Sequence, residues 1–136
     1  MDVIAKTKEV GLPPDEYVLV AGGAMAARGL KETADIDLVV SPKTYQGLKA
    51  RGWQELRHGS STYLMHGVYE VFMDWDSPDE APNLEELLRI SEIVDGVAVV
   101  SLQRVLQWKK RINRPKDQAD IKKIEKYLAD KKRNER

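Results

Sequence analysis

The sequence predicts an α+β domain in which strands and helices alternate along the chain, and three patterns carry this prediction. Two short runs rich in Val and Leu, residues 17–21 and 35–40, have the composition of buried strands. Asp95-Gly96 lies between apolar flanks, which is a hairpin signal. Ser41-Pro42 is a favourable helix start, with Ser as N-cap and Pro in the first turn. We therefore expect a mixed, mostly antiparallel sheet with helices packed on one side.

Turn residues set the expected boundaries in the first half of the chain. Gly11 and the Pro13-Pro14 pair end a first helix, and Gly52 ends the helix that Ser41 caps. His58-Gly59-Ser60 separates two segments of alternating polarity, which suggests a hairpin. In chain order we expect helix 2–10, strand 17–21, helix 24–30, strand 35–40, helix 41–51, strands 53–57 and 61–66, and strand 68–75.

Capping residues set the boundaries in the second half. Asn83 and Ser101 have the side chains that N-caps require, and Arg114-Pro115 places a proline in the first turn of the last helix. We expect a polar loop at 76–83, a helix from 83 to 90, a hairpin at 93–100, a helix at 101–112 and a final helix from 114. Residues 1–136 would then form a single domain, with 101–130 as a C-terminal helical pair.

Composition narrows the classes of protein. A chain of 136 residues is long enough for one domain with one core. The absence of cysteine excludes disulfides, thiolate zinc sites and cysteine nucleophiles, and it fits a cytoplasmic location. There is no apolar stretch of membrane-spanning length, and the first residues lack the pattern of a signal peptide. We therefore expect no membrane partner and no secretion.

The net charge of zero hides a strong asymmetry along the chain. Residues 1–103 carry 9 Lys and Arg against 17 Asp and Glu, whereas residues 104–136 carry 13 against 5. Such a division can mark a surface for phosphates or nucleic acid. The last residues, 131–136, are expected to form a flexible basic tail.

Two aspartates, Asp35 and Asp37, flank one isoleucine at the start of the second apolar run, shortly after Gly22-Gly23. Because side chains alternate faces along a strand, both carboxylates should point the same way, about 7 Å apart. Like charges held this close at the edge of an apolar sheet repel each other and resist desolvation. A divalent cation resolves this conflict, and hard carboxylate oxygens suit Mg²⁺.

This segment resembles the signature of the nucleotidyltransferase superfamily, in which a glycine turn precedes an Asp-x-Asp or Asp-x-Glu strand. Residues 114–121, Arg-Pro-Lys-Asp-Gln-Ala-Asp-Ile, resemble the C-terminal motif of small bacterial and phage members, including abortive-infection toxin and antitoxin types. The similarity covers roughly residues 15–128. It implies a nucleotidyltransferase fold, a nucleoside triphosphate as substrate, and Mg²⁺ or Mn²⁺ as cofactor, held by Asp35, Asp37 and a third acid.

The strand expected at 68–75 offers two candidates for the third acid. Glu70 and Asp74 are four residues apart, so a regular strand directs both to the same face. A carboxylate in the middle of an apolar strand is costly unless it has a partner, so we favour Glu70 as a metal ligand and catalytic residue. Asp74, nearer the strand end, is the runner-up.

The resemblance also implies nucleotide contacts. Gly22 and Gly23 would let the backbone approach the triphosphate, and amides at the following helix start would meet the phosphates. Many superfamily members have Ser or Thr next, where this chain has Gly23 and Ala24. Arg28 is a candidate phosphate or acceptor contact, although a surface position explains it equally well. Thr33 is expected to shape the loop before the acids.

The C-terminal motif is expected to support the site rather than carry the chemistry. Lys109 and Lys116, with Arg114, could neutralise the charge of a triphosphate. Asp117 lies at a helix N-terminus, where an acid is favoured, and we expect it to hold Lys109 or Lys116 in place.

Two functions follow from the resemblance. The first is an enzyme that moves a nucleoside monophosphate onto an acceptor hydroxyl of RNA, a protein or a small molecule, and the basic C-terminal third favours RNA. Its acceptor would need an open face, a homodimer partner or another protein. The alternative is a catalytically weak or inactive binding module, such as an antitoxin that acts through a protein partner. Burying a carboxylate pair without a metal is costly, which argues for a working site.

Overall fold

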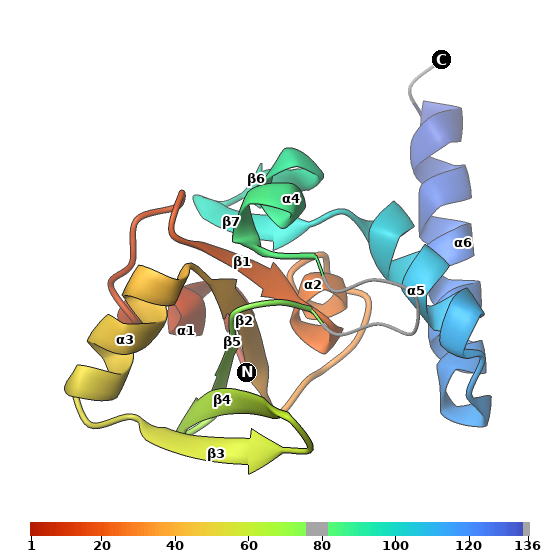
Figure 1. Cartoon of the computed structure of the whole chain (residues 1–136). Coiled ribbons are helices and arrows are strands. Elements are labelled where there is room, and N and C mark those ends of the chain that lie inside the picture. Colours follow the sequence, from red (N-terminus) through yellow and green to blue (C-terminus); the bar gives the residue numbers. More distant parts are fainter. Residues whose placement is uncertain (76–81, 135–136) are drawn as a thin grey trace.

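The computed structural model describes residues 1–75 and 82–134, in which helices and strands alternate as the sequence predicts (Figure 1). In chain order the elements are α1 (Val3–Glu9), β1 (Tyr17–Val20), α2 (Gly22–Ala26), β2 (Ile36–Val40), α3 (Pro42–Ala50), β3 (Gln54–His58), β4 (Ser61–His66), β5 (Tyr69–Phe72), α4 (Leu84–Arg89), β6 (Ser91–Val94), β7 (Val97–Val100), α5 (Leu102–Ile112), the 3₁₀ helix η1 (Pro115–Asp117) and α6 (Gln118–Asn134).

The described strands form one seven-stranded sheet in the order β3-β4-β5-β2-β1-β7-β6. The pairs β1–β2, β3–β4, β4–β5 and β6–β7 are antiparallel, whereas β1–β7 and β2–β5 are parallel. The expectation of a mixed, mostly antiparallel sheet is therefore confirmed. β2 lies inside the sheet between β1 and β5, and this position brings Asp37 of β2 next to Glu70 of β5.

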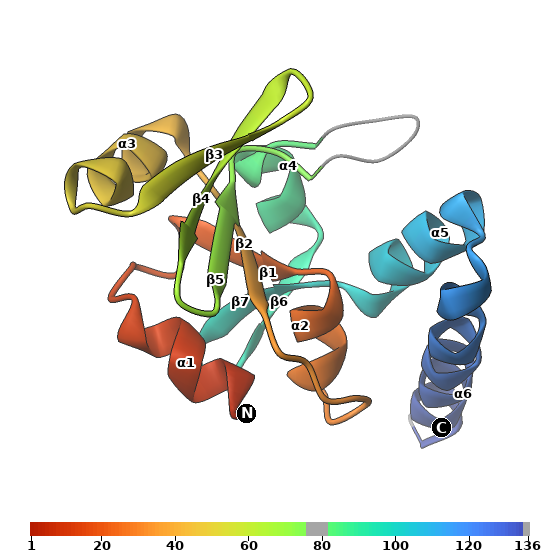
Figure 2. The ribbon, with the colours of Figure 1, turned by 90° about the horizontal axis from the view of Figure 1, so that it is seen from below.

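Helices cover both faces of the central strands, which corrects the expectation that they would pack on one side. Every residue of β1 and of β7 is buried. Because neighbouring side chains of a strand point to opposite faces, each face must be covered. Figure 2 shows α1 and α4 on opposite sides of these strands. A carboxylate on the adjacent strand β2 therefore lies among apolar side chains.

The observed helix caps are those that the sequence predicts. The side chains of Ser41 and Ser101 accept hydrogen bonds from backbone amides three residues later, at 3.1 and 3.2 Å. Asn83 forms a capping box with Glu86 at the start of α4. Each cap satisfies an amide that the first helical turn leaves without a partner, so these helix starts are fixed locally.

Several boundaries differ from the expectation, and α2 ends at Ala26 rather than at residue 30. α2 begins at Gly22 rather than at residue 24, because Ala21 makes the turn itself with a φ of +58°. β5 ends at Phe72 rather than at residue 75, since its neighbour β2 ends at Val40 before the proline of α3. α6 continues to Asn134, so the segment expected as a flexible tail is helical as far as the structure describes it. Residues 76–81 of the expected loop lie outside the described part.

The C-terminal helices form a separate layer beside the sheet. α5 and α6 lie side by side in both views (Figures 1 and 2), and Ile121 and Ile124 of α6 are buried, as their helical spacing predicts. In the part of the chain that the structure describes, every helix is too short or too polar to cross a lipid bilayer.

Candidate functional site

The acidic residues of β2 and β5 meet in the middle of the sheet. Asp37 of β2 lies directly opposite Glu70 of β5 in the parallel register, and Asp35 comes immediately before β2. Asp35 is exposed, whereas Asp37 and Glu70 are partly buried. Burial, the charges of Glu70 and Asp35, and a hydrogen bond with Glu70 raise the pKa of Asp37 to about 7. The two strands thus bring together the three acids that the sequence singles out.

The carboxylate of Asp37 has an unsatisfied atom. Its Oδ1 is buried and has no hydrogen-bond partner among the described residues. A buried polar atom without a partner costs about 1–3 kcal/mol, more when it is charged. A cation would satisfy this atom and offset the repulsion between the three carboxylates, and oxygen donors of this kind suit Mg²⁺ or Mn²⁺.

The side chains do not already form a closed cage. Within residues 1–75 and 82–134, no group of three His, Asp or Glu side chains is arranged closely enough to hold a metal ion as it stands. The donor types and the unsatisfied oxygen of Asp37 fit a divalent cation, but the carboxylates would have to move toward it. Asp35 is exposed, so its side chain has room to change rotamer.

The glycine turn lies beside the loop that leads to the acids. Ala21 has a backbone conformation with positive φ that residues other than glycine rarely adopt. It connects β1 directly to α2. A methyl group built on Gly22 would lie 3.3 Å from the hydroxyl oxygen of Thr33. Thr33 in turn donates a hydrogen bond of 3.2 Å to the backbone carbonyl of Asp35. The side chain of Thr33 therefore lies close to Gly22 of the turn and also contacts the backbone of Asp35.

Gly23 has a packing role that can be tested separately. A methyl group at this position would lie 2.6 Å from Cδ1 of Leu19, which is fully buried. We expect Gly23→Ala to lower the free energy of unfolding by about 1–3 kcal/mol, because the core cannot accept the added carbon without moving. Gly47→Ala in α3, where an added methyl group meets nothing within 4 Å, is the matched control and should stay within about 1 kcal/mol of wild type. Urea denaturation followed by circular dichroism measures both, and equal losses in the two variants would contradict the packing role.

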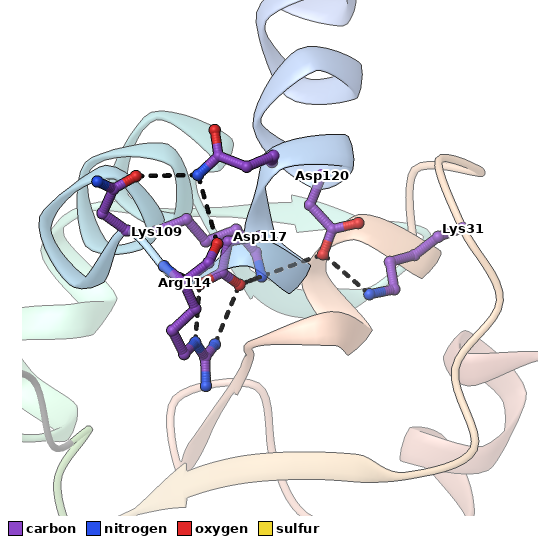
Figure 3. A network of polar contacts seen from close by, with 7 residues as sticks. Lys31, Lys109, Arg114, Asp117 and Asp120 are labelled. Carbon is purple, nitrogen blue, oxygen red and sulfur yellow. Dashed lines mark hydrogen bonds and ion pairs between the residues drawn. The ribbon is translucent and has the colours of Figure 1, made fainter.

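A network of ion pairs joins α5, η1 and α6 (Figure 3). The carboxylate of Asp117 accepts hydrogen bonds from Arg114 at 2.7 and 3.0 Å and from Lys109 at 3.2 Å. The side chains of Lys109 and Asp117 are only 8% and 2% exposed. The bonds from Arg114, followed by the contact with Lys109, lower the pKa of Asp117 to about 2. The contact expected between Asp117 and Lys109 is thus present.

The same network reaches the acidic loop through Lys31, a residue that the sequence gave no reason to single out. Oδ2 of Asp120 lies 3.0 Å from Nζ of Lys31 and 3.1 Å from Nζ of Lys109. Burial opposes the charge of Asp120, but the bonds from both lysines hold its pKa below the ordinary value. Because Lys31 belongs to the loop between α2 and β2, Asp120 connects the C-terminal helices to the segment that carries Asp35.

The other expected nucleotide contacts have different surroundings. The guanidinium of Arg28 pairs with Glu92 of β6 and donates a 2.8 Å hydrogen bond to the carbonyl of Ala24. Its side chain is 4% exposed, so its present contacts are with the protein itself. Lys116 is exposed on η1. Asp74 is exposed beyond the end of β5, where its backbone forms an isolated antiparallel β-bridge with Asn83.

These features define a class of protein, an α+β domain with an acidic cluster on two central strands and a basic helical pair beside it. No family model matches the sequence, and no curated protein matches it either. Among solved structures, it is similar to the crystal structure of ANT(2″)-Ia in complex with adenylyl-2″-tobramycin. That match has a TM-score of 0.54 and 14% identical residues, and it covers 96% of this chain and 88% of that chain. The chain therefore has the fold of a nucleotidyltransferase structure.

Proposed function

We propose that this protein is a metal-dependent nucleotidyltransferase that transfers a nucleoside monophosphate from a nucleoside triphosphate to an acceptor hydroxyl. One observation carries the proposal: Asp37, with an unsatisfied buried oxygen, lies opposite Glu70 and beside Asp35 on a nucleotidyltransferase fold. A bound cation and a polyphosphate would offset the desolvation of these carboxylates and the repulsion between them. The similar structure holds an adenylyl compound, which agrees with nucleotide chemistry on this fold.

The proposed residues have distinct roles. Asp35, Asp37 and Glu70 would hold Mg²⁺ or Mn²⁺, with Asp74 as the runner-up to Glu70, and the bound ions would neutralise charge on the triphosphate. The register of Glu70 with Asp37 supports Glu70 as the third acid. The acceptor oxygen forms a bond to the α-phosphorus while the bond to the bridging oxygen breaks. Pyrophosphate leaves with that electron pair, and the hydroxyl proton passes to Glu70.

Backbone and basic groups would position the nucleotide. Amides after Gly22 and Gly23 would face the phosphates, with Thr33 holding the adjacent loop. Lys109 and Lys116 are the proposed cationic contacts, and Asp117 holds Lys109 in place. Lys109 would have to exchange part of its contact with Asp117 or Asp120 for a phosphate oxygen.

A second candidate is a nucleotide-binding or partner-binding module without turnover, of the antitoxin type. Two observations favour it. No hydroxyl follows the glycine turn at Ala24, and the described acids do not form a closed metal cage. In that case the protein would bind a nucleotide weakly, or would act through a protein partner.

Calorimetric titration separates these candidates. We expect the wild type to bind nucleoside triphosphates only when Mg²⁺ or Mn²⁺ is present, and we expect Asp37→Asn to weaken this binding tenfold or more, which is about 1.4 kcal/mol. Asp95→Asn, at the exposed tip of the β6–β7 hairpin, is the matched control and should bind like the wild type. A pyrophosphate assay on the same samples reports turnover.

Each result has a clear meaning. Metal-dependent binding with pyrophosphate release supports the enzyme, and the same binding without release supports the module. Absence of binding at millimolar concentrations of all four nucleotides would reject the proposed site. Equal binding by wild type and Asp37→Asn would show that the nucleotide uses another part of the surface.

A further inference from the structure

A hollow of about 480 Å³ lies between the β3–β4 hairpin and β5, next to the acidic cluster. Glu70 lines this hollow, and it is also the residue that faces Asp37 across the two strands. The volume is within the usual range for small-molecule sites. An acceptor held here would therefore lie beside the carboxylate to which its hydroxyl proton passes in the proposed reaction.

Aromatic rings and hydroxyl groups form the walls of the hollow. The rings of Tyr63 and Phe72 are stacked, with centroids 5.6 Å apart and planes inclined by 22°. Ser60 and Ser61 supply hydroxyl groups from the hairpin side, whereas the hydroxyl of Thr62 is hydrogen-bonded to Tyr45 of α3. Stacked rings offer a flat apolar surface to a ring of a ligand, and hydroxyls can donate to or accept from its polar groups.

The hairpin wall is held in place by α3. The hydroxyl of Tyr45, a fully buried residue of α3, donates a 2.8 Å hydrogen bond to Glu55 of β3 and lies 3.2 Å from the hydroxyl of Thr62. Lys49 of α3 forms a further bond of 3.0 Å to Glu55. These contacts fix the position of Thr62 before any ligand binds, which lowers the cost of ordering a site.

The charge of the hollow disfavours a polyanion. The described residues that line it include the carboxylates Glu70 and Asp74 and the imidazole of His58, but no Lys or Arg. A nucleic acid needs cations for its phosphates, and most of its affinity for proteins comes from such contacts. The basic helices α5 and α6 do not line this hollow in the described part of the chain. The hollow is therefore acidic, and it lies apart from the basic side chains of the C-terminal third.

We infer that the acceptor is a small molecule with a hydroxyl group on a ring, neutral or cationic, bound on the Tyr63–Phe72 stack, rather than RNA. This inference rests on the proposed function and names its acceptor class. The transferred group forms its new bond to the ring hydroxyl, and pyrophosphate is released as described above. This acceptor class differs from RNA, which the overall charge of the C-terminal third favours.

The test uses the whole protein with nucleoside triphosphates labelled at the α-phosphorus and with Mg²⁺. The acceptors are tyramine, glucosamine and a short RNA with a free 3′ hydroxyl. We expect label on at least one ring compound and none on the RNA. Tyr63→Leu and Phe72→Leu should each raise the KM for that acceptor tenfold or more, while the affinity for the metal–nucleotide complex, measured by calorimetry, stays unchanged. Tyr127→Leu on α6 is the control and should leave both quantities at wild-type values.

The test distinguishes failure of the proposed function from failure of the proposed acceptor class. Absence of nucleotide binding rejects the proposed function, and this inference falls with it. Intact nucleotide binding with label on the RNA, or on none of the three acceptors, overturns the acceptor class alone. Label on a ring compound with unchanged KM in both aromatic variants overturns the assignment of the hollow. A second hairpin variant, Ser61→Trp, should block labelling without altering the core, so a folding defect in Phe72→Leu cannot be mistaken for a loss of binding.

Discussion

Asp117→Asn is expected to lower the free energy of unfolding by about 3–5 kcal/mol, the cost of removing one partner from a buried ion pair. The side chains of Asp117 and Lys109 are both almost fully buried, and Arg114 makes two further bonds to the same carboxylate. A neutral amide cannot balance these two cations. It would leave Lys109 with Asp120 alone, a carboxylate that Lys31 already shares.

Urea denaturation monitored by circular dichroism measures this loss. Glu125→Gln is the matched control, since Glu125 forms an exposed pair with Lys110, with side chains 49% and 52% exposed. Exposed pairs contribute about 0–1 kcal/mol, so this variant should be nearly as stable as the wild type. A loss in Asp117→Asn no larger than in Glu125→Gln would show that the network adds little to stability.

Protonation of Asp117 should also lower the free energy of unfolding at acid pH. The pKa of Asp117 is lowered from its ordinary value to about 2 in the folded protein. Its contribution is therefore complete above about pH 4 and is lost as the pH falls toward about 2, which amounts to roughly 2 kcal/mol. Asp117→Asn should show a smaller loss of stability over this acid range than the wild type.

The order of elements could be read from the sequence because its signals are local. Ser41, Asn83 and Ser101 each satisfy a nearby amide, and Asp95-Gly96 makes a tight turn, so neighbouring residues decide these features. α2 starts two residues before the expected position because Ala21, not glycine, adopts the positive φ. The conformational propensity of alanine does not predict such a turn, since alanine ordinarily adopts a negative φ.

Contacts between distant segments could be read only in part. The parallel register that places Glu70 opposite Asp37 depends on the crossover through α3, β3 and β4. A lone mid-strand acid suggested the partner, but only the sheet order decides between Glu70 and Asp74 as its neighbour. Lys31 lies 89 residues from Asp120, and a single lysine in a loop carries no pattern that predicts this contact.

The sequence pattern also does not predict that the rings of Tyr63 and Phe72 stack. Alternation within β4 and β5 indicates which residues share a face, but the two strands must pair in a particular register before the rings meet. The overall charge of the C-terminal third does not predict the charge of the hollow, for a similar reason. Among the described residues, the Lys and Arg side chains of α5 and α6 do not line the hollow, so its charge differs from that of residues 104–136.

The stability of the metal-free protein is expected to fall as the pH rises from about 4 to about 7. The pKa of Asp37 is raised from its ordinary value to about 7 in the folded state, so over this range the folded protein retains a proton that the unfolded chain has lost. Folding stability then decreases with pH, by on the order of 4 kcal/mol for a shift of this size. The stabilising contribution of the protonated carboxyl is complete below about pH 4 and is lost through about pH 7.

Thermal and urea denaturation in a chelating buffer, at steps between about pH 5 and pH 8, test this prediction. Asp37→Asn should remove most of the decline, since an amide stays neutral, and at pH 8 it should be more stable than the metal-free wild type by up to about 4 kcal/mol. Asp95→Asn, the control in the β6–β7 hairpin at one edge of the sheet, should decline like the wild type. Adding Mg²⁺ at pH 8 should stabilise the wild type but not Asp37→Asn, because a ligand stabilises only the state that binds it. A flat pH profile for the metal-free wild type would mean that Asp37 is solvated and ionised in solution, and the electrostatic argument for a cation at this carboxylate would then fail.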